Sequence, residues 1–254
     1  MMSDPLPAYV IVGATGGIGS AVCRRLAATG ARLLLVARDG GKLSALADEL
    51  RQLSAAGEYL SHPADATKSA DVDAAFAQAT ESFGSLAGAT NLVGSILLKS
   101  AHTTTDDEFE QTLSLNTRTA FYVLRAAAKA MLSSGGSIVL ASTVATRIGL
   151  ANHEAIAAAK GAVNGLVLAA AATYAQRNIR VNAVAPGLVD TPLAAKITGS
   201  ELALKASTAM HPLGRIGKPD DVAAALCWLL DPATTWVTGQ VIGIDGGLST
   251  VRSK

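Results

Sequence analysis

The stretch YVIVGATGGIG, residues 9–19, places four glycines directly after a short apolar run and directly before a helical pattern. Glycine permits positive φ in a tight turn and lets the backbone approach a ligand closely. A helix that begins at such a turn offers unpaired N–H groups and the positive end of its dipole to a phosphate. The stretch therefore predicts a strand, a phosphate-binding turn and a helix, the opening unit of a dinucleotide-binding α/β fold.

The rest of the chain continues this alternation of strands and helices. Short runs rich in Val, Ile and Leu predict strands at Ala8–Val12, Arg32–Val36, Glu58–His62, Gly88–Val93, Ser137–Ala141, Arg180–Ala183 and Gln240–Ile244. Ala-rich or helically periodic segments predict helices at Ile18–Thr29, Gly41–Leu53, Ser69–Phe83, Asp106–Leu132, Glu154–Gln176 and Pro219–Leu230. Apolar strands separated by helices are typical of a parallel sheet covered on both faces. We predict a Rossmann-type, doubly wound parallel sheet of about seven strands in a single α/β domain, residues 1–254.

One segment, Leu188–Pro212, interrupts the alternation. It carries Gly199, several charges and only weak periodicity. We expect small helices here, residues 188–212, inserted over the carboxyl edge of the sheet on the substrate side, because ligands of such folds bind at that edge.

The composition excludes several classes of function. Half of the 254 residues are hydrophobic, charged residues make up 16%, and the net charge is +1. This balance, without a Lys/Arg-rich run, argues against nucleic acid or an anionic membrane as a partner. The apolar stretches read as too short or too interrupted to span a bilayer, and the N-terminus lacks the basic region of a signal peptide. With two unpaired cysteines, Cys23 and Cys227, we expect a reduced cytoplasmic protein without a metal site that acts on a small molecule.

The glycine spacing itself indicates a family. Gly13-x-x-x-Gly17-x-Gly19 resembles the fingerprint of the short-chain dehydrogenase/reductase family, Thr-Gly-x-x-x-Gly-Ile-Gly, with Val12 in place of the threonine. The resemblance covers essentially the whole chain, through PADAT (63–67), NLVG (91–94), LSLNTRTAF (113–121), RVNAVAPGLVDTPL (180–193), HPLGRIGKPDDVA (211–223) and TGQVIGIDGG (238–247). It implies an oxidoreductase that uses a nicotinamide cofactor on a carbonyl or hydroxyl group.

The resemblance also implies which residues bind the cofactor. These are Gly13, Thr15, Gly16, Gly17, Ile18, Gly19, Arg38, Asp65, Ala66, Asn91, Gly94, Lys160, Pro186, Gly187, Val189 and Thr191. At the end of the second strand, Ala37 lacks the carboxylate that would bind the ribose hydroxyls of NAD(H), and Arg38 follows it. A guanidinium is a bidentate partner for a 2′-phosphate, so the pair favours NADP(H) over NAD(H). The alternative is that Arg38 is solvated and pairs with Asp39.

The segment HEAIAAAKG, residues 153–161, resembles the catalytic segment of the family except at one position. There a tyrosine exchanges the substrate proton, and a lysine four residues later binds the nicotinamide ribose and lowers the tyrosine pKa. Lys160 matches the lysine, but Ile156 stands at the tyrosine position and cannot exchange a proton. We expect no other tyrosine to be well placed to substitute among Tyr9, Tyr59, Tyr122 and Tyr174.

The remaining catalytic side chains of the family have counterparts. Asn116 matches the asparagine that orders a water, and a hydroxyl that holds the carbonyl oxygen comes from Thr143, favoured by spacing, or from Ser142. At 100° per residue, His153 falls on the helical stripe of Ile156 and Lys160, so it is a candidate replacement acid. Alternatively His153 merely flanks the helix, and Lys160 or an ordered water delivers the proton.

Two classes of function remain open. The first is an NADP(H)-dependent oxidoreductase with an altered proton donor, and the second is a catalytically impaired cofactor-binding module or partner subunit. An apolar pocket, which favours a fairly apolar substrate, is expected from Ile96, Leu97, Leu98, Ile148, Leu150, Ile156, Leu188 and Leu193. The two longest predicted helices resemble the paired interface helices of the family. With the C-terminal segment Trp236–Gly247, they predict a homo-oligomer, a tetramer or a dimer.

Overall fold

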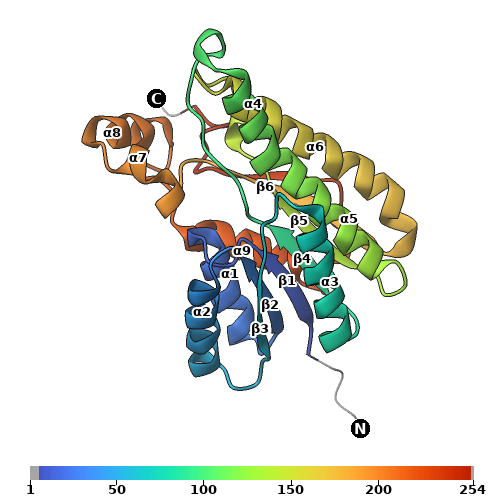
Figure 1. Ribbon diagram of the computed structural model, residues 1–254. Coiled ribbons are helices and arrows are strands. Elements are labelled where there is room, and N and C mark those ends of the chain that lie inside the picture. The colour runs from blue at the N-terminus through green and yellow to red at the C-terminus, as the bar shows by residue number, and fades with distance from the viewer. Residues whose placement is uncertain (1–5, 253–254) are drawn as a thin grey trace.

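The computed structural model describes residues 6–252, in which a seven-stranded parallel sheet forms the centre (Figure 1). The strands are β1 (Ala8–Val12), β2 (Arg32–Ala37), β3 (Tyr59–Pro63), β4 (Gly88–Asn91), β5 (Gly136–Ala141), β6 (Ile179–Pro186) and β7 (Val241–Ile244). Their order is β3-β2-β1-β4-β5-β6-β7, so the chain winds outward from β1 in both directions. The order reverses between β1 and β4, which opens a crevice at their carboxyl ends. The predicted fold class is confirmed; residues 1–5 and 253–254 of the predicted domain lie outside the described residues.

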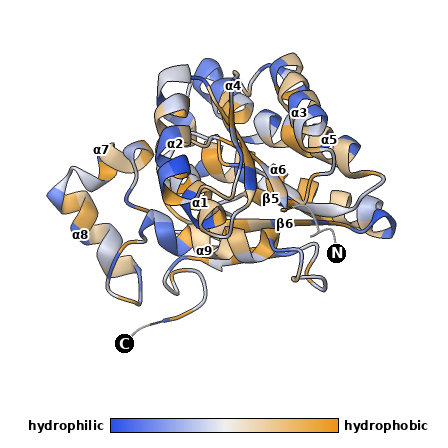
Figure 2. Ribbon diagram, turned by 90° about the horizontal axis from the view of Figure 1, so that it is seen from below, coloured by the Kyte–Doolittle hydropathy of each residue, from blue (hydrophilic) through white to orange (hydrophobic). Residues whose placement is uncertain are grey.

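Helices cover both faces of the sheet. They are α1 (Gly17–Ala28), α2 (Gly40–Leu53), α3 (Ser69–Phe83), α4 (Asp106–Leu113), α5 (Thr119–Met131), α6 (Glu154–Tyr174), α7 (Ala195–Thr198), α8 (Glu201–Met210) and α9 (Pro219–Leu230). One hydrophobic core holds α3, α5 and α6 against the sheet, and a second holds α1, α2 and α9 against the opposite face. Figure 2 shows that hydrophobic residues are concentrated in the strands and in the helices that cover them.

The first strand shows why its residues are apolar throughout. Ala8, Val10 and Val12 belong to the core on the α3–α5–α6 side, while Tyr9 and Ile11 belong to the core on the α1–α2–α9 side. Successive side chains of a strand point to opposite faces, so a strand covered by helices on both faces needs an apolar residue at every position.

The predicted helix 106–132 is interrupted in its middle. A π-helical turn, Ser114–Arg118, separates α4 from α5. The side-chain amide of Asn116 donates to the carbonyl oxygen of Thr112 (2.9 Å), and the hydroxyl of Thr119 donates to that of Leu115 (2.8 Å). Side chains that bond to helix carbonyls compete with the regular backbone ladder, and such turns are frequent at functional sites.

The segment after β6 holds η5 (Pro192–Ala194), α7 and α8. In Figures 1 and 2, α7 and α8 stand apart from the layered body. None of the residues of α8 is buried. The segment therefore contributes little to the core and much to the surroundings of the carboxyl edge.

Helix α6 qualifies the expectation about membrane spans. Together with the turn that follows it, residues Glu154–Arg177, it is long and apolar enough to cross a bilayer by length and composition. Its side chains at Val163, Val167 and Ala171 are instead buried in the core beneath the sheet. A helix that packs on a sheet can have the same composition as a weak membrane span, and this packing accounts for the buried 44% of the apolar window of α6.

Candidate active site

The glycine turn after β1 closes against β2 and β4. The backbone N–H groups of Gly13 and Ala14 donate to the carbonyl of Val36 (2.8 and 3.1 Å). Gly13 has φ of +87°, and a Cβ there would lie 3.0 Å from the backbone of Leu92. At Gly19 a Cβ would run into the carbonyl oxygen of Gly13. The turn is therefore closed to larger residues, and it presents the N-terminus of α1 to the crevice.

A pocket of about 740 Å³, called here the long pocket, runs from this turn along the carboxyl ends of β2 and β3. Of the residues predicted to bind the cofactor, those that line it are Gly13, Thr15, Gly16, Arg38, Asp65, Ala66 and Gly94. The carboxylate of Asp65 accepts from the hydroxyl and the backbone N–H of Thr67 (2.8 and 3.0 Å). These bonds hold the pKa of Asp65 below its usual value, so the carboxylate stays ionised and its remaining lone pairs can accept from hydroxyls of a ligand.

The long pocket contains basic side chains that the sequence analysis did not identify. Besides Arg38, it is lined by Lys42 in the first turn of α2 and by Arg118 at the end of the π-helical turn. The carboxylate of Asp39 caps α2 by accepting from the N–H of Lys42 (3.1 Å) and lies 3.9 Å from its ammonium. Within residues 6–252, Arg38 has no ion-pair partner, which argues against the alternative that Asp39 neutralises it. The sequence did not indicate Lys42 as a pocket residue, because its place beside Asp39 depends on how α2 begins after β2.

Two smaller cavities continue from the long pocket toward α6. The inner cavity, about 160 Å³, is lined by Ile18, Gly94, Asn116, Ser142, Thr143, Ile156, Lys160, Pro186, Gly187, Leu188, Val189 and Thr191 among others. The outer cavity, about 150 Å³, is lined by Ile96, Leu98, Thr143, Val144, Leu150, His153, Ile156, Gly187, Leu188, Ile197, Ser207, Met210, His211 and Leu248. Five residues belong to both linings, so the two cavities adjoin. The fold thus gathers nearly all predicted site residues at one edge of the sheet.

Lys160 is buried at the base of the inner cavity. Its side chain, on α6, donates from Nζ to the carbonyl oxygen of Ala141 at the end of β5 (2.8 Å), and the residue is 7% exposed. Burial disfavours the charged ammonium and lowers the pKa of Lys160 to about 8. One donor bond leaves two further ammonium protons available to a ligand.

Asn116 fixes the wall beside Lys160. Its amide nitrogen donates to the hydroxyl of Ser95 (2.9 Å), and its amide oxygen accepts from the backbone N–H of Ser95 (3.2 Å). A Cβ on Gly94 would lie 2.8 Å from that amide oxygen and 3.5 Å from Nζ of Lys160. The side-chain amide of Asn116 therefore holds the loop after β4, and Gly94 leaves room for both side chains.

The side chain of Asn91 forms hydrogen bonds within the protein and does not line the pocket. It was predicted to bind the cofactor, but its side chain is 2% exposed and lines neither the long pocket nor the inner cavity. Its amide donates to the hydroxyl of Thr119 (3.0 Å) and accepts from the N–H of Val93 (3.3 Å). In the structure the side chain holds the loop between β4 and Gly94 in place, and contact between Asn91 and the cofactor stays a prediction.

The two candidate hydroxyls after β5 differ in their surroundings. Ser142 is 5% exposed, and its hydroxyl donates to the amide oxygen of Asn164 (2.6 Å). Thr143 lines both the inner and the outer cavity. Its hydroxyl oxygen accepts weakly from the N–H of Ala145 (3.4 Å), which leaves its proton to donate to a ligand. Of the two hydroxyls, that of Thr143 is therefore the one left free at both cavities, and its catalytic role stays a prediction.

Ile156 stands between these groups as an apolar wall. The residue is 5% exposed and lines both cavities. His153, one turn before it, occupies the N-cap position of α6 and lines the outer cavity only. Its ring nitrogen Nδ1 lies 2.8 Å from the carbonyl oxygen of Ala151, so Nδ1 is the protonated nitrogen and Nε2 is free of protein partners among the described residues.

The apolar set predicted for a substrate pocket is gathered in part. Ile96, Leu98, Leu150, Ile156 and Leu188 line the outer cavity, whereas Leu193 lines the long pocket and the inner cavity. Leu97 and Ile148 line neither of the smaller cavities. Residues of the segment 188–212 that the sequence analysis did not single out, Ile197, Met210 and His211, complete the wall. The cavity wall is formed by segments that are far apart in the chain, and no local sequence pattern indicates that they come together.

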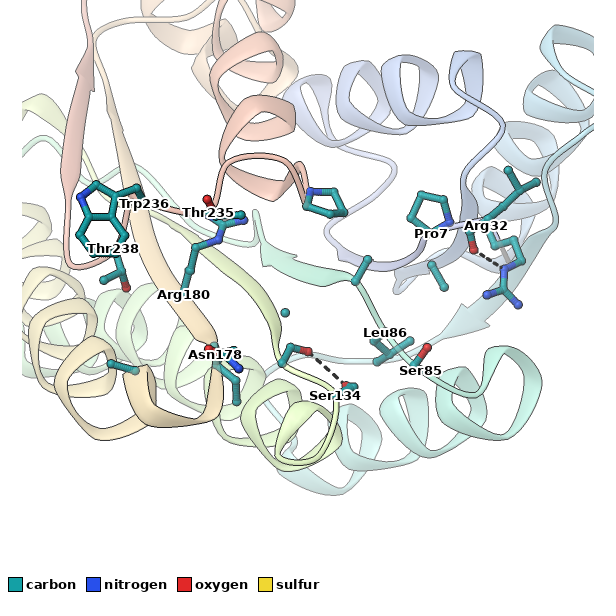
Figure 3. Close-up of a pocket in the computed structure, with 18 residues that line it drawn as sticks. Pro7, Arg32, Ser85, Leu86, Ser134, Asn178, Arg180, Thr235, Trp236 and Thr238 are labelled. Atoms are coloured by element: carbon teal, nitrogen blue, oxygen red, sulfur yellow. Dashed lines mark hydrogen bonds between the residues drawn. The ribbon is translucent and has the colours of Figure 1, made fainter. Parts of the chain in front are cut away.

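A further cavity, about 770 Å³, opens at the amino-terminal edge of the sheet (Figure 3). Its two arginines bond to the protein itself. Arg180 donates to the carbonyls of Leu229 and Asp231 (2.9 and 3.0 Å), and Arg32 donates to that of Leu6 (2.9 Å). It lies at the other end of the strands from the glycine turn and contains none of the predicted site residues.

Together, the sheet order, the glycine turn at the crevice and the buried lysine define a dinucleotide-binding oxidoreductase fold. A family model described as enoyl-(acyl carrier protein) reductase matches residues 13–249. The chain is 36% identical to galactitol 2-dehydrogenase (L-tagatose-forming) of Cereibacter sphaeroides, covering 93% of this chain and 92% of that protein.

Comparison with solved structures supports the same family. A short-chain dehydrogenase/reductase from Mycobacterium ulcerans superposes with a TM-score of 0.93 at 32% identity, covering 99% of this chain and 92% of that one. A variant of actinorhodin polyketide ketoreductase with NADPH superposes with a TM-score of 0.89 at 28% identity, covering 97% of this chain and 98% of that one. The chain belongs to the short-chain dehydrogenase/reductase family and is an oxidoreductase that acts on hydroxyl or carbonyl groups.

Proposed function

We propose that this enzyme uses NADP(H) on a small, fairly apolar carbonyl or alcohol, with a proton donor other than tyrosine. The observation that carries the proposal is the arrangement around Ile156. Lys160, Asn116 and Thr143 surround the inner cavity as a cofactor-dependent site requires, while the position between them is apolar. When bound, the nicotinamide supplies or accepts the hydride. The chain must hold the cofactor, orient the carbonyl oxygen and provide a proton.

The preference for NADP(H) rests on charge in the long pocket. Arg38 follows the strand end where Ala37 offers no carboxylate, and Lys42 lies one helical turn further on. Two basic groups beside an adenosine ribose stabilise a 2′-phosphate by charge-assisted hydrogen bonds. Asp65 and Ala66 would border the adenine, and Lys160 would donate to the hydroxyls of the nicotinamide ribose. The ketoreductase with NADPH described above uses the same fold for this cofactor.

Thr143 is the residue proposed to hold the substrate oxygen. Its free hydroxyl proton points to a donor role, and it lies on the wall shared by both cavities. The ammonium of Lys160 would also stabilise an oxyanion that forms there. The electrostatic attraction between the two charges is stronger in a buried site than in water. Below about pH 8 that ammonium is present, because the pKa of Lys160 is about 8.

His153 is the proposed proton donor. Its Nδ1–H donates to Ala151, so a neutral ring has no proton on Nε2 and only the imidazolium can donate toward the outer cavity. The reductive rate should therefore fall with rising pH, because the donor must be the imidazolium. Lys160 would instead give a rate that falls near pH 8, from the pKa above. An ordered water would add no histidine-dependent step to the profile.

A panel of aldehydes, ketones and quinones with NADPH oxidation as the readout tests the proposal. We expect His153→Ala to lower the rate by about 10²–10⁴, because a general acid contributes about that much, and to remove the fall in rate with rising pH. His102→Ala, in the exposed turn Ala101–Thr103, is the matched control. It should leave the rate and its pH dependence unchanged. Unchanged rate and pH profile in His153→Ala would eliminate the histidine and leave Lys160 or a water.

Ile156→Tyr is the complementary variant. It places a phenol four residues before Lys160, about 6 Å along the axis of α6 on the same stripe. We expect it to create or raise carbonyl reductase activity. The second candidate function, a cofactor-binding subunit without catalysis, is favoured by the apolar Ile156 alone. It becomes the better account if NADPH binds but neither the wild type nor Ile156→Tyr turns over any substrate of the panel.

The proposed state is a cytoplasmic homotetramer, with a dimer as the smaller alternative. Large apolar side chains are exposed on the helices predicted to pair, Phe121 on α5 and Leu168 on α6, and at Trp236, which is 97% exposed in the single chain. Exposed apolar groups of this size favour burial against another copy. Both cysteines are free, which agrees with a reducing compartment.

A further inference from the structure

His211 follows directly on α8 and is buried although the helix before it is not. The residue is 3% exposed, while α8 has no buried residue. Its ring nitrogen Nδ1 lies 2.7 Å from the carbonyl oxygen of Ser207, and Nε2 lies 3.3 Å from the backbone nitrogen of Leu188. The N–H of Leu188 can only donate, so Nε2 must be unprotonated and Nδ1 must carry the proton.

The ring of His211 fits against the turn after β6 because Gly187 has no side chain. A Cβ on Gly187 would lie 2.5 Å from Nε2 of the ring. On its other side, a Cβ on Gly246 would lie 3.7 Å from the ring and the Cβ of His211. The imidazole therefore fills a defined space between two glycine-containing turns, and it is a buried contact between the end of α8 and the body of the protein.

The turn that His211 holds belongs to the active site. Gly187 and Leu188 line both the inner and the outer cavity, and His211 itself lines the outer one. Both ring nitrogens are engaged by the backbone, so neutral His211 has no proton to give to a substrate. Its contribution must come through the position of Leu188 and through the position of α8 over the cavity.

We propose that His211 is a positioning residue that couples the segment 192–210 to the turn Gly187–Leu188, so that cofactor affinity depends on a neutral His211. Protonation would place an N–H on Nε2 directly against the N–H of Leu188 and replace an attraction by a repulsion. The inference rests on nicotinamide binding by the proposed function. It is independent of the identity of the proton donor.

The charged groups that share cavities with His211 leave its acceptor role intact. Asp245 is occupied by the N–H groups of Gly247 and Ser249 (3.0 Å each). Arg215 and Asp221 pair with each other (2.6 Å). His153 faces the same outer cavity from the start of α6 and is a second imidazole there, so the experiment must separate the two histidines.

The test measures NADPH binding by nicotinamide fluorescence in His211→Phe and His211→Gln. Phenylalanine fills the space without an acceptor, whereas a glutamine amide can accept from Leu188 and donate to Ser207. We expect His211→Phe to weaken binding roughly ten-fold, because a buried N–H is left unsatisfied, and His211→Gln to stay within about two-fold. Proteolysis within α7–α8 in the presence of NADPH should rise in the phenylalanine variant only.

Acidification supplies a second arm that needs no folded phenylalanine variant. From about pH 7.5 to about pH 5.5, wild-type affinity should fall, the fall should persist in His153→Ala, and it should be absent in His211→Gln. An unchanged affinity in a folded His211→Phe, or an acid-dependent loss that remains in His211→Gln, overturns the proposal. Because binding and not turnover is read, failure of the proton-donor hypothesis leaves these outcomes unaffected.

Discussion

Replacing Lys160 by methionine should stabilise the protein while it removes cofactor binding. The ammonium of Lys160 is buried beneath the inner cavity and has a single protein partner, the carbonyl of Ala141. The side chain of methionine is similar in length to that of lysine and carries no charge. Residues that serve function at the expense of stability are common in active sites. The protein groups that bind a ligand are buried there even when no ligand is bound.

The magnitude follows from the lowered pKa of Lys160. Burial takes that pKa from 10.5 to about 8. At about 1.36 kcal/mol for each pH unit, the difference of about 2.5 corresponds to about 3 kcal/mol by which folding disfavours the charged lysine. The hydrogen bond to Ala141 that methionine lacks offsets about 1 kcal/mol of this. We therefore expect the free energy of unfolding of Lys160→Met to exceed that of the wild type by about 2 kcal/mol at about pH 7.

The effect has a defined pH window. Between about pH 8 and 10.5 the unfolded chain holds the lysine proton and the folded chain does not. Stability rises with pH wherever the unfolded state binds more protons, so the wild type gains stability through this window. The advantage of Lys160→Met is therefore full below about pH 8 and disappears as pH approaches 10.5.

Urea unfolding of the cofactor-free protein, followed by circular dichroism at about pH 7 and about pH 9.5, measures both quantities. Lys129→Met, an exposed position on α5, is the matched control, and surface substitutions of this kind stay within about 0.5 kcal/mol. A Lys160→Met variant that is less stable than the wild type at neutral pH, or whose advantage does not shrink with rising pH, would refute the reasoning.

Three further outcomes are expected. Arg38→Ala should weaken NADPH binding by about 1–3 kcal/mol and leave NADH binding nearly unchanged, as measured by calorimetry; equal losses would contradict the 2′-phosphate assignment. Gly94→Ala should abolish cofactor binding in equilibrium dialysis without unfolding the protein, because the new Cβ would lie 2.8 Å from the amide oxygen of Asn116. Light scattering should give a tetramer for the wild type and a smaller species for Leu168→Glu, since Leu168 is 61% exposed on α6; a wild-type monomer at micromolar concentration would exclude the assembly.

The layered fold was predictable because each decisive signal is local. Strands buried on both faces are apolar at every position, and the glycines of residues 13–19 are required by backbone conformation and by contact with Leu92 and Gly13. The spacing that singles out Thr143 is local in the same way, and its role stays a prediction. That Ile156 stands four residues before Lys160 is also a local fact of the sequence, whereas its occupying the position of a catalytic tyrosine stays a prediction.

What needed the tertiary structure are contacts between segments far apart in the chain. Asn91 carries a matching motif, yet its amide is used up by Thr119, a partner 28 residues away, and the π-helical turn arises from side chains that compete for helix carbonyls. Lys42 and His211 carry no motif, and their places in the long pocket and at the turn after β6 depend on how α2 and α8 pack. Sequence periodicity reports which face of an element is buried. It does not report which partner meets that face, because that is decided by the packing of the whole chain.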